Sequence, residues 1–301
     1  MPGCVIYNWS ESKNQYMYEY SEDCAIETPG ECFTYKDTTL VDSFNINYDE
    51  CITYMTNIKM PEDMIAPICS GESADGLTLK SAIEEGILDI SELKSNNVIT
   101  NIVETTGIEI TGYDNTCGGM DVILPSNIDG KDIVSIGTLS FGQDMGYNNN
   151  NNIFLISNEE EKFEINSIDM SNCINLKKIS DEAFWGNNLT NVSMSNSVTY
   201  IGDRAFSGNQ LTNVTIPDSV DTIMYNAFSE NKLTDVIIGS NVIIIEIGAF
   251  AKTPYSNSNL TTITNKTGKT FDWGNIINGE TGFNFETGTV VNSTGNVEIT
   301  K

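Results

Sequence analysis

The sequence of 301 residues contains no histidine. Ser-His-Asp and Cys-His catalysis, histidine metal sites and imidazole acid–base chemistry are therefore excluded. Carboxylates remain as acid–base groups, but neighbouring pairs such as Glu84 and Glu85 are typical of a solvated surface. We expect no catalytic residue, no bound cofactor and no metal site.

Basic residues are scarce, with 15 Lys and Arg against 42 Asp and Glu and a net charge of −27. A surface of this charge repels phosphate backbones and anionic lipid headgroups, so we expect neither nucleic-acid binding nor adsorption to acidic membranes. The excess of acid is typical of a protein that stays soluble outside the cell.

Long apolar runs are also missing. The longest candidate, "VIIGSNVIIIEIGAF", is short of the ~18 residues that span a bilayer and is interrupted by polar residues, so we expect no membrane insertion. The start, "MPGCVIYNWSE", lacks the basic and apolar segments of a signal peptide. The protein is then either retained in the cell that makes it or begins after a removed leader.

No C-x-x-C pair occurs, which argues against zinc ribbons and thioredoxin-like chemistry. Cys173 lies in the repeat described below and is predicted to be a buried structural thiol. The other six cysteines can form three disulfides in any of fifteen pairings, and they are Cys4, Cys24, Cys32, Cys51, Cys69 and Cys117. This number favours an oxidising, extracellular setting, with seven reduced thiols in a cytosol as the alternative.

The sequence does contain a repeat. The dipeptide Ala-Phe occurs at four places, each 22 residues after the last: 183–184, 205–206, 227–228 and 249–250. The same step relates columns of Ile, Leu, Val and Asn, which include Ile179/201/223/245, Leu189/211/233, Val192/214/236 and Asn187/209/231. A fixed period with several columns in register is the signature of a solenoid.

Each repeat predicts one coil. "LTNVTI" alternates apolar and polar residues, as a strand with one buried face does. We therefore expect parallel strands near 189–194, 211–216 and 233–238 in a right-handed solenoid. The phenylalanines of the Ala-Phe pairs should stack on the opposite wall, and the recurrent asparagines should bond to the backbone of a tight turn.

"SVTYIGDRAFSGNQLTNVTIPDSV" (197–220) closely resembles the BspA-like leucine-rich repeats of bacterial surface proteins. The resemblance covers about residues 103–265. It implies a hairpin that caps the first coil, formed by "GIEITGYDNTCGGMDVILPSNIDGKDIVSIG", and a rigid array that binds host matrix proteins or other cells. The sequence after the repeats has a weaker likeness to the β-rich segments of some Gram-positive envelope proteins.

Three regions follow from these patterns. Residues 1–97 are predicted to form an acidic, cysteine-rich α+β domain. Residues 98–267 form the mainly β solenoid with its hairpin cap and a loop insertion near 142–163, and residues 268–301 form a short β-rich tail. Aromatic residues gather near the start, in "YNWSESKNQYMYEY", where Tyr16, Tyr18 and Tyr20 are predicted to line one face of a strand. A platform that stacks on carbohydrate is the alternative for that cluster.

The preferred hypothesis for function is a non-enzymatic protein of the extracellular space or cell surface, which recognises a protein or cell-surface ligand through its solenoid. A structural subunit of a pilus-like appendage that self-associates is one alternative, and a glycan-acting enzyme in the N-terminal region is another. The candidate binding positions are those of the strands that point away from the core: Asn191, Ser193, Asn213, Thr215, Asp235 and Ile237.

Overall fold

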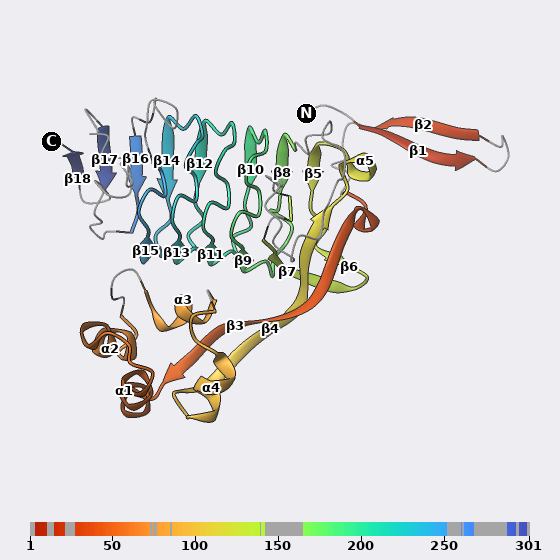
Figure 1. The fold of residues 1–301 in the computed structure, drawn as a ribbon. Helices are drawn as coiled ribbons and strands as arrows, with labels where there is room; N and C mark the ends of the chain where they lie inside the picture. The colour runs from red at the N-terminus through yellow and green to blue at the C-terminus, as the bar shows by residue number, and fades with distance from the viewer. Residues whose placement is uncertain are drawn as a thin grey trace.

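The structure is a computed structural model in which stacked coils form a mainly β solenoid (Figure 1). It describes residues 4–10, 15–21, 28–72, 74, 77–84, 86–138, 140–141, 165–251, 260, 262–267, 288–292 and 295–299. The insertion predicted near 142–163 and most of the predicted tail lie outside these residues. None of the described helices is long and apolar enough to cross a membrane.

Each coil contributes one strand to each of two strand columns. The first column holds β5 (Asp121–Ile123), β8 (Ser167–Asp169), β10 (Asn191–Ser193), β12 (Asn213–Thr215), β14 (Asp235–Ile238), β16 (Thr262–Asn265), β17 (Gly288–Asn292) and β18 (Gly295–Ile299). The second holds β7 (Lys131–Ile136), β9 (Lys178–Ile179), β11 (Tyr200–Ile201), β13 (Thr222–Ile223) and β15 (Ile244–Ile245). Paired coils lie parallel, as Val214 beside Val236 and Ile201 beside Ile223, one repeat apart. β18 is an exception, because it pairs antiparallel with β17. The parallel solenoid predicted from the repeat is confirmed.

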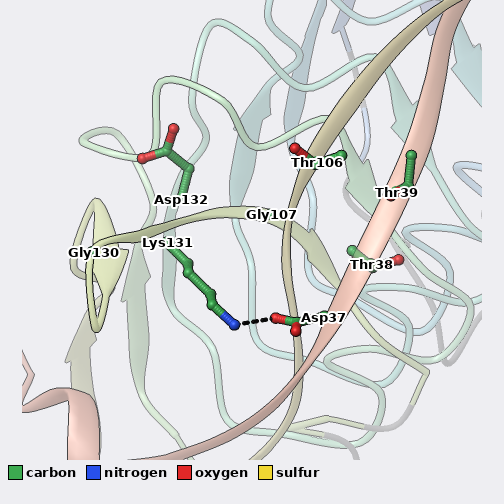
Figure 2. Close-up of a pocket in the computed structure, with 8 residues that line it drawn as sticks. All are labelled: Asp37, Thr38, Thr39, Thr106, Gly107, Gly130, Lys131 and Asp132. Carbon is green, nitrogen blue, oxygen red and sulfur yellow. Dashed lines mark hydrogen bonds and ion pairs between the residues drawn. The ribbon is translucent and has the colours of Figure 1, made fainter.

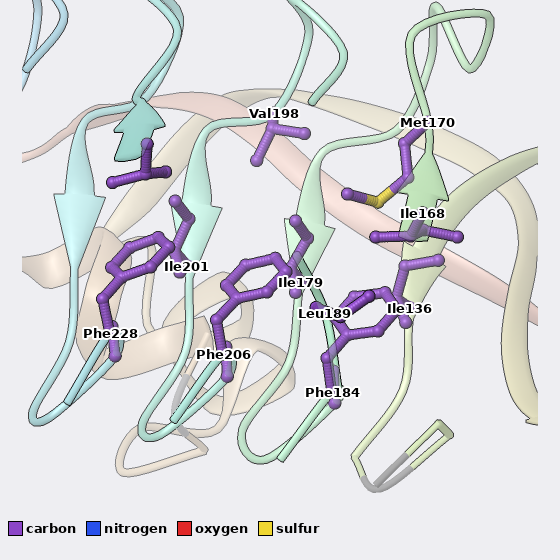
Figure 3. Packing of buried hydrophobic residues seen from close by; sticks show 14 of the residues in the cluster. Ile136, Ile168, Met170, Ile179, Phe184, Leu189, Val198, Ile201, Phe206 and Phe228 are labelled. Atoms are coloured by element: carbon purple, nitrogen blue, oxygen red, sulfur yellow. The ribbon is translucent and has the colours of Figure 1, made fainter. Parts of the chain in front are cut away.

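The phenylalanine stack predicted for the repeats is present and fully buried (Figure 3). Ring centroids are 5.0 Å apart between Phe184 and Phe206, 5.2 Å between Phe206 and Phe228 and 5.4 Å between Phe228 and Phe250. These rings lie within 10° of parallel. Phe141 extends the stack by one ring at 4.9 Å from Phe184. One continuous apolar core therefore runs through the coils.

The repeated asparagines form the predicted ladder along this core. The Asn209 amide nitrogen donates to the carbonyl oxygens of Phe184 and Phe206, at 2.9 and 3.0 Å, and its oxygen accepts from the Leu189 amide at 3.0 Å. Asn231 makes the same bonds one coil later, to Phe206, Phe228 and Leu211. Each side chain thus satisfies backbone groups of two adjacent coils that would otherwise be buried without partners.

The first coil is covered by two long strands. β3 (Phe33–Ile46) pairs antiparallel with β4 (Ile99–Tyr113), and β4 in turn pairs in parallel with β7. β6 (Asn127–Ile128) forms a short hairpin with β7. The rings of Phe33 and Tyr113 continue the aromatic stack beyond Phe141, at 6.3 and 5.2 Å from it. The cap closes both the sheet and the core.

The segment between β3 and β4 forms a small helical module with its own core. Its helices are α1 (Tyr48–Asn57), α2 (Glu62–Cys69), α3 (Leu79–Glu84) and α4 (Ile90–Ser95), and Figure 1 shows them beside the lower ends of the coils. A 3-10 turn, η1 (Gly30–Cys32), and the short helix α5 (Asn115–Gly118) flank the β3–β4 pair. A domain boundary at residue 97 remains a proposal. β3 lies before this boundary but belongs to the sheet of the solenoid through its pairing with β4, so the two proposed domains share one sheet.

Two disulfides hold the cap and the module. Cys32 bonds to Cys117, and Cys51 bonds to Cys69 within the module. Cys173 is a fully buried thiol, and its sulfur donates to the carbonyl oxygen of Pro125 at 3.3 Å. The predicted structural thiol is confirmed. The side chains of Cys4 and Cys24 lie outside the described residues.

The stack yields a stability test. Replacing Phe206 by Ala removes the ring between Phe184 and Phe228, and we expect a loss of about 3–5 kcal/mol in the free energy of unfolding. Urea denaturation followed by far-UV circular dichroism measures it. Thr215→Ala, at an exposed position of the same coil, is the control and should change stability little. Equal midpoints for Phe206→Ala and the unaltered chain would contradict the packing described here.

The thiols yield a labelling test. Treatment of the native, unreduced protein with iodoacetamide should leave Cys173 unmodified, because it is buried, and labelling should follow only after denaturation. Cys32, Cys51, Cys69 and Cys117 should label only after reduction. Peptide mass spectrometry reads each site separately. Labelling of these four cysteines in denatured but unreduced protein would rule out the disulfides.

Candidate recognition face of the solenoid

The six predicted binding positions lie on the first strand column, on the side away from the core. Alternation along each strand puts Val214 and Val236 inside, where they are buried, and their neighbours outside. Asn191, Asn213, Thr215 and Asp235 are exposed, whereas Ser193 and Ile237 are half-buried. Four of the six positions form two directly paired columns, Asn213 beside Asp235 and Thr215 beside Ile237.

The structure does not bring all six together in one sheet. β10 pairs with β8, so Asn191 lies beside Ser167 and Ser193 beside Asp169. β12 begins a separate sheet with β14, β16, β17 and β18, and β10 is not paired with it. The single sheet predicted through 189–194, 211–216 and 233–238 is therefore wrong at its first step. The phenylalanine stack stays closed at this coil boundary, so the opening is confined to the outer face.

The continuous part of the face extends from β12 towards the C-terminal coils. We name this surface, made by Asn213, Thr215, Asp235, Ile237, Thr262 and Thr264, the recognition face. Its side chains are short, and Asp235 carries its one charge. Such a face presents polar side chains in a regular array, because residues of neighbouring strands lie directly beside one another.

The outer side of the second strand column is closed. Tyr200, Thr222 and Ile244 precede the core residues of their strands and so lie on the opposite side, yet they are only 2%, 4% and 4% exposed. The helical module lies on this side: the Lys80 ammonium donates to Asp221 at 2.8 Å, and both side chains are half-buried.

A small cavity of about 210 Å³ lies between the module and the coils. Ile83 and Ile90 of the module, Leu40 of β3, and Lys177 and Thr199 of the coils are among the residues that line it. The module therefore occupies one side of the solenoid and leaves the other to the recognition face.

The geometry agrees with the comparison to protein families. Residues 151–275 match, in six copies, the family model described as "BspA type Leucine rich repeat region". The coils of residues 151–275 are therefore similar to BspA-type leucine-rich repeats. The crystal structure of T. pallidum leucine-rich repeat protein (TpLRR) is similar at 22% identity and a TM-score of 0.32, over 52% of this chain and 63% of that one. This chain therefore spans less than two thirds of that structure. No curated protein matches the sequence.

A second hollow lies at the N-terminal end of the solenoid, where the β3–β4 pair crosses β7 (Figure 2). It measures about 640 Å³, and Thr38, Thr39 and Thr106 supply hydroxyl groups to its wall. Lys131 and Asp37 form an ion pair of 2.5 Å across it, with side chains 47% and 74% exposed. Both side chains of this ion pair are largely exposed to water. A ligand in the hollow would therefore meet polar groups that water already solvates, and we expect it to bind weakly.

Gly107 is what permits the strands to cross so closely at this hollow. A Cβ atom at residue 107 would lie 2.4 Å from the carbonyl oxygen of Asp132 and 2.6 Å from the Val134 side chain. Since real Cβ atoms do not approach backbone so closely, the crossing requires glycine. This role is not predictable from the sequence, because a lone glycine within a strand gives no sign of which backbone approaches it.

One carboxyl group of the solenoid has a strongly altered pKa. Burial raises the pKa of Asp203 to about 6, the Arg204 guanidinium opposes this shift, and Asp181 and Glu182 add to it. One oxygen of Asp203 is buried with no hydrogen-bond partner in the described structure. No described group of three or more Cys, Asp and Glu could hold a metal ion. We interpret Asp203 as a destabilised carboxylate in a crowded turn.

This carboxylate generates a pH prediction. The pKa of Asp203 is about 6 in the folded chain, against an ordinary value of 3.8 for an aspartate side chain. The folded chain therefore binds the proton more tightly, and the contribution of Asp203 to stability falls as the pH rises from about 4 to 6. Asp203→Asn should raise the melting temperature at pH 7 and leave it nearly unchanged at pH 3.5. Differential scanning calorimetry at both values measures the difference.

Asp235→Asn is the control for this experiment. It removes the same charge from a chain of net charge −27 but lies on the exposed recognition face. A gain at pH 7 as large for this control would mean that net repulsion, and not the burial of Asp203, is responsible. A lower melting temperature for Asp203→Asn at pH 7 would show that the carboxylate stabilises the turn.

Proposed function

We propose that this chain is a non-enzymatic extracellular surface protein that binds a protein or cell-surface partner through the recognition face. The observation that supports this most directly is the asymmetry of the solenoid. The outer side of one strand column is buried beside the helical module, while Asn213, Thr215 and Asp235 on the other are exposed. The BspA-type family and the two disulfides support a role outside the cell.

The chemistry of the recognition face favours a partner that forms a row of hydrogen bonds. Asn213, Thr215, Thr262 and Thr264 carry groups that both donate and accept, and Asp235 on the strand between them accepts. Neighbouring strands of this face lie about 4.8 Å apart. A partner of extended shape can contact several coils at once, so small contributions add along its length. Because Asp235 is the one charge there, we expect binding to depend only weakly on salt.

A pair of arginine substitutions tests this proposal. Asn213→Arg with Asp235→Arg places two long cationic side chains at the centre of the recognition face, and binding should fall at least about tenfold. The probe is the fluorescently labelled chain on surfaces coated separately with fibronectin, laminin and collagen. Circular dichroism confirms that the variant is folded.

The matched control carries the same charge change on the helical module, as Asn57→Arg with Asp63→Arg, both at exposed positions. Loss of binding in the first variant and not in the second supports the proposal. Binding that survives in the first variant, or is lost only in the second, places the contact elsewhere and overturns it. An unaltered chain that binds none of the three surfaces counts against recognition of matrix protein.

A further inference from the structure

The cavity between the helical module and the coils, which we name the module cavity, combines apolar and basic side chains. Its volume is about 210 Å³. None of the described residues that line it is fully buried, so solvent reaches its walls. It lies on the side of the solenoid that the recognition face does not use. It is also apart from the hairpin of β1 (Cys4–Ser10) and β2 (Gln15–Ser21), which Figure 1 shows extending beyond the coils.

The part of the wall that β3 and the module supply is mostly apolar. Leu40 and Val41 of β3, Ile83 of α3 and Ile90 of α4 line the cavity, and all four side chains are half-buried. Apolar surface that stays in contact with water is stabilised when an apolar group covers it. A cavity of about 150 Å³ with apolar walls holds benzene. The module cavity therefore has room for one ring with a short substituent.

The coils supply a cation. Lys177 lines the cavity and is half-buried, and among the described residues its ammonium group forms no ion pair. The neighbouring Lys178 lies over the ring of Tyr200, with its nitrogen 5.1 Å from the ring centroid. Thr199 of the next coil lies beside Lys177, since its backbone amide donates to the Lys177 carbonyl oxygen at 2.8 Å. A half-buried ammonium group without a partner is suited to pair with a carboxylate.

The charge of the wall differs in sign from that of the chain. Lys177 and Lys178 both line the cavity, against one described carboxylate, Asp42, which accepts a hydrogen bond from the Thr105 hydroxyl. The whole chain has only 15 Lys and Arg and a net charge of −27. Its overall field repels anions. A small anion that does bind must therefore be held by a local group such as Lys177.

We propose that the module cavity binds a small amphipathic carboxylate with an apolar body about the size of one aromatic ring. The carboxylate pairs with Lys177, and the apolar body packs against Ile83 and Ile90. An apolar pocket with a few polar groups that fix orientation is the usual form of a small-molecule site. The ligand contacts the module and the coils at once, as the ion pair of Lys80 and Asp221 does. It therefore strengthens the attachment of the module to the array.

Saturation-transfer NMR of the full chain with phenylacetate tests the proposal. Phenylacetate has the ring and the carboxylate that the cavity accommodates, and titration to about 10 mM covers the weak affinity expected of so small a ligand. Phenylacetamide has nearly the same shape without the charge. It should bind at least about tenfold more weakly, because it loses the charge-assisted bond to Lys177.

Two variants test the assignment of the site. Lys177→Gln removes the charge and should raise the dissociation constant of phenylacetate at least about tenfold. Lys232→Gln, at an exposed position of the coils, makes the same change away from the cavity and should leave the constant unaltered. Thr199→Tyr fills the cavity and should abolish binding, whereas Thr215→Tyr on the recognition face should not. Circular dichroism confirms that all four variants are folded.

Hydrogen-exchange mass spectrometry locates the ligand without a mutation. Phenylacetate should slow exchange in peptides that contain α3, α4 and β9, because it joins the module to the coils, and phenylacetamide should not.

Three results would overturn the inference. The first is an unaltered chain that binds no phenylacetate, and the second is equal binding by the Lys177→Gln and Lys232→Gln variants. The third is slower exchange only in segments outside the module cavity. Matrix-protein binding by the same samples is a separate readout on the recognition face, so failure at the cavity leaves the proposed function intact.

Discussion

The structure depends on the requirement that each coil completes the one before it. Phe206 has an aromatic ring on both sides only because Phe184 and Phe228 lie one repeat away in each direction. Asn209 satisfies the backbone of two coils through the same spacing. Because apolar packing and hydrogen bonding impose the same 22-residue step, a change of length inside a coil disturbs both at once. Additional residues are tolerated where the chain turns outside the stack.

The N-terminal cap completes the first coil of the stack, which has no preceding coil to pack against. The rings of Tyr113 and Phe33 replace the preceding coil that Phe141 lacks, and β4 supplies the strand that β7 needs. Both come from outside the repeat and are fastened by the disulfide between Cys32 and Cys117. The cap therefore satisfies the aromatic and the backbone requirements of the array with sequence that bears no trace of the repeat.

The residues that repeat were sufficient to predict the coils, the phenylalanine stack, the asparagine ladder and the exposure of Asn213 and Asp235. Pairing of Ile46 with Ile99 was not predictable, because two strands so far apart in sequence leave no local periodicity. The two-residue strands of the second column are too short to show alternation. Residue type also gives no sign of the opening beside β10, since Val192 and Val214 occupy the same repeat position. The helical module was not predicted from the sequence, and so the side of the solenoid that it covers was not predicted either.

The position of the helical module in the chain has a consequence for how proteins of this design can vary. Ile46 and Ile99 lie opposite each other, so the module leaves and rejoins the solenoid at one place. Its apolar core is separate from that of the coils. An insertion with adjacent ends and an independent core can be lengthened, exchanged or lost with little effect on its host. Evolution can thus alter what lies beside the array while the array itself keeps its spacing.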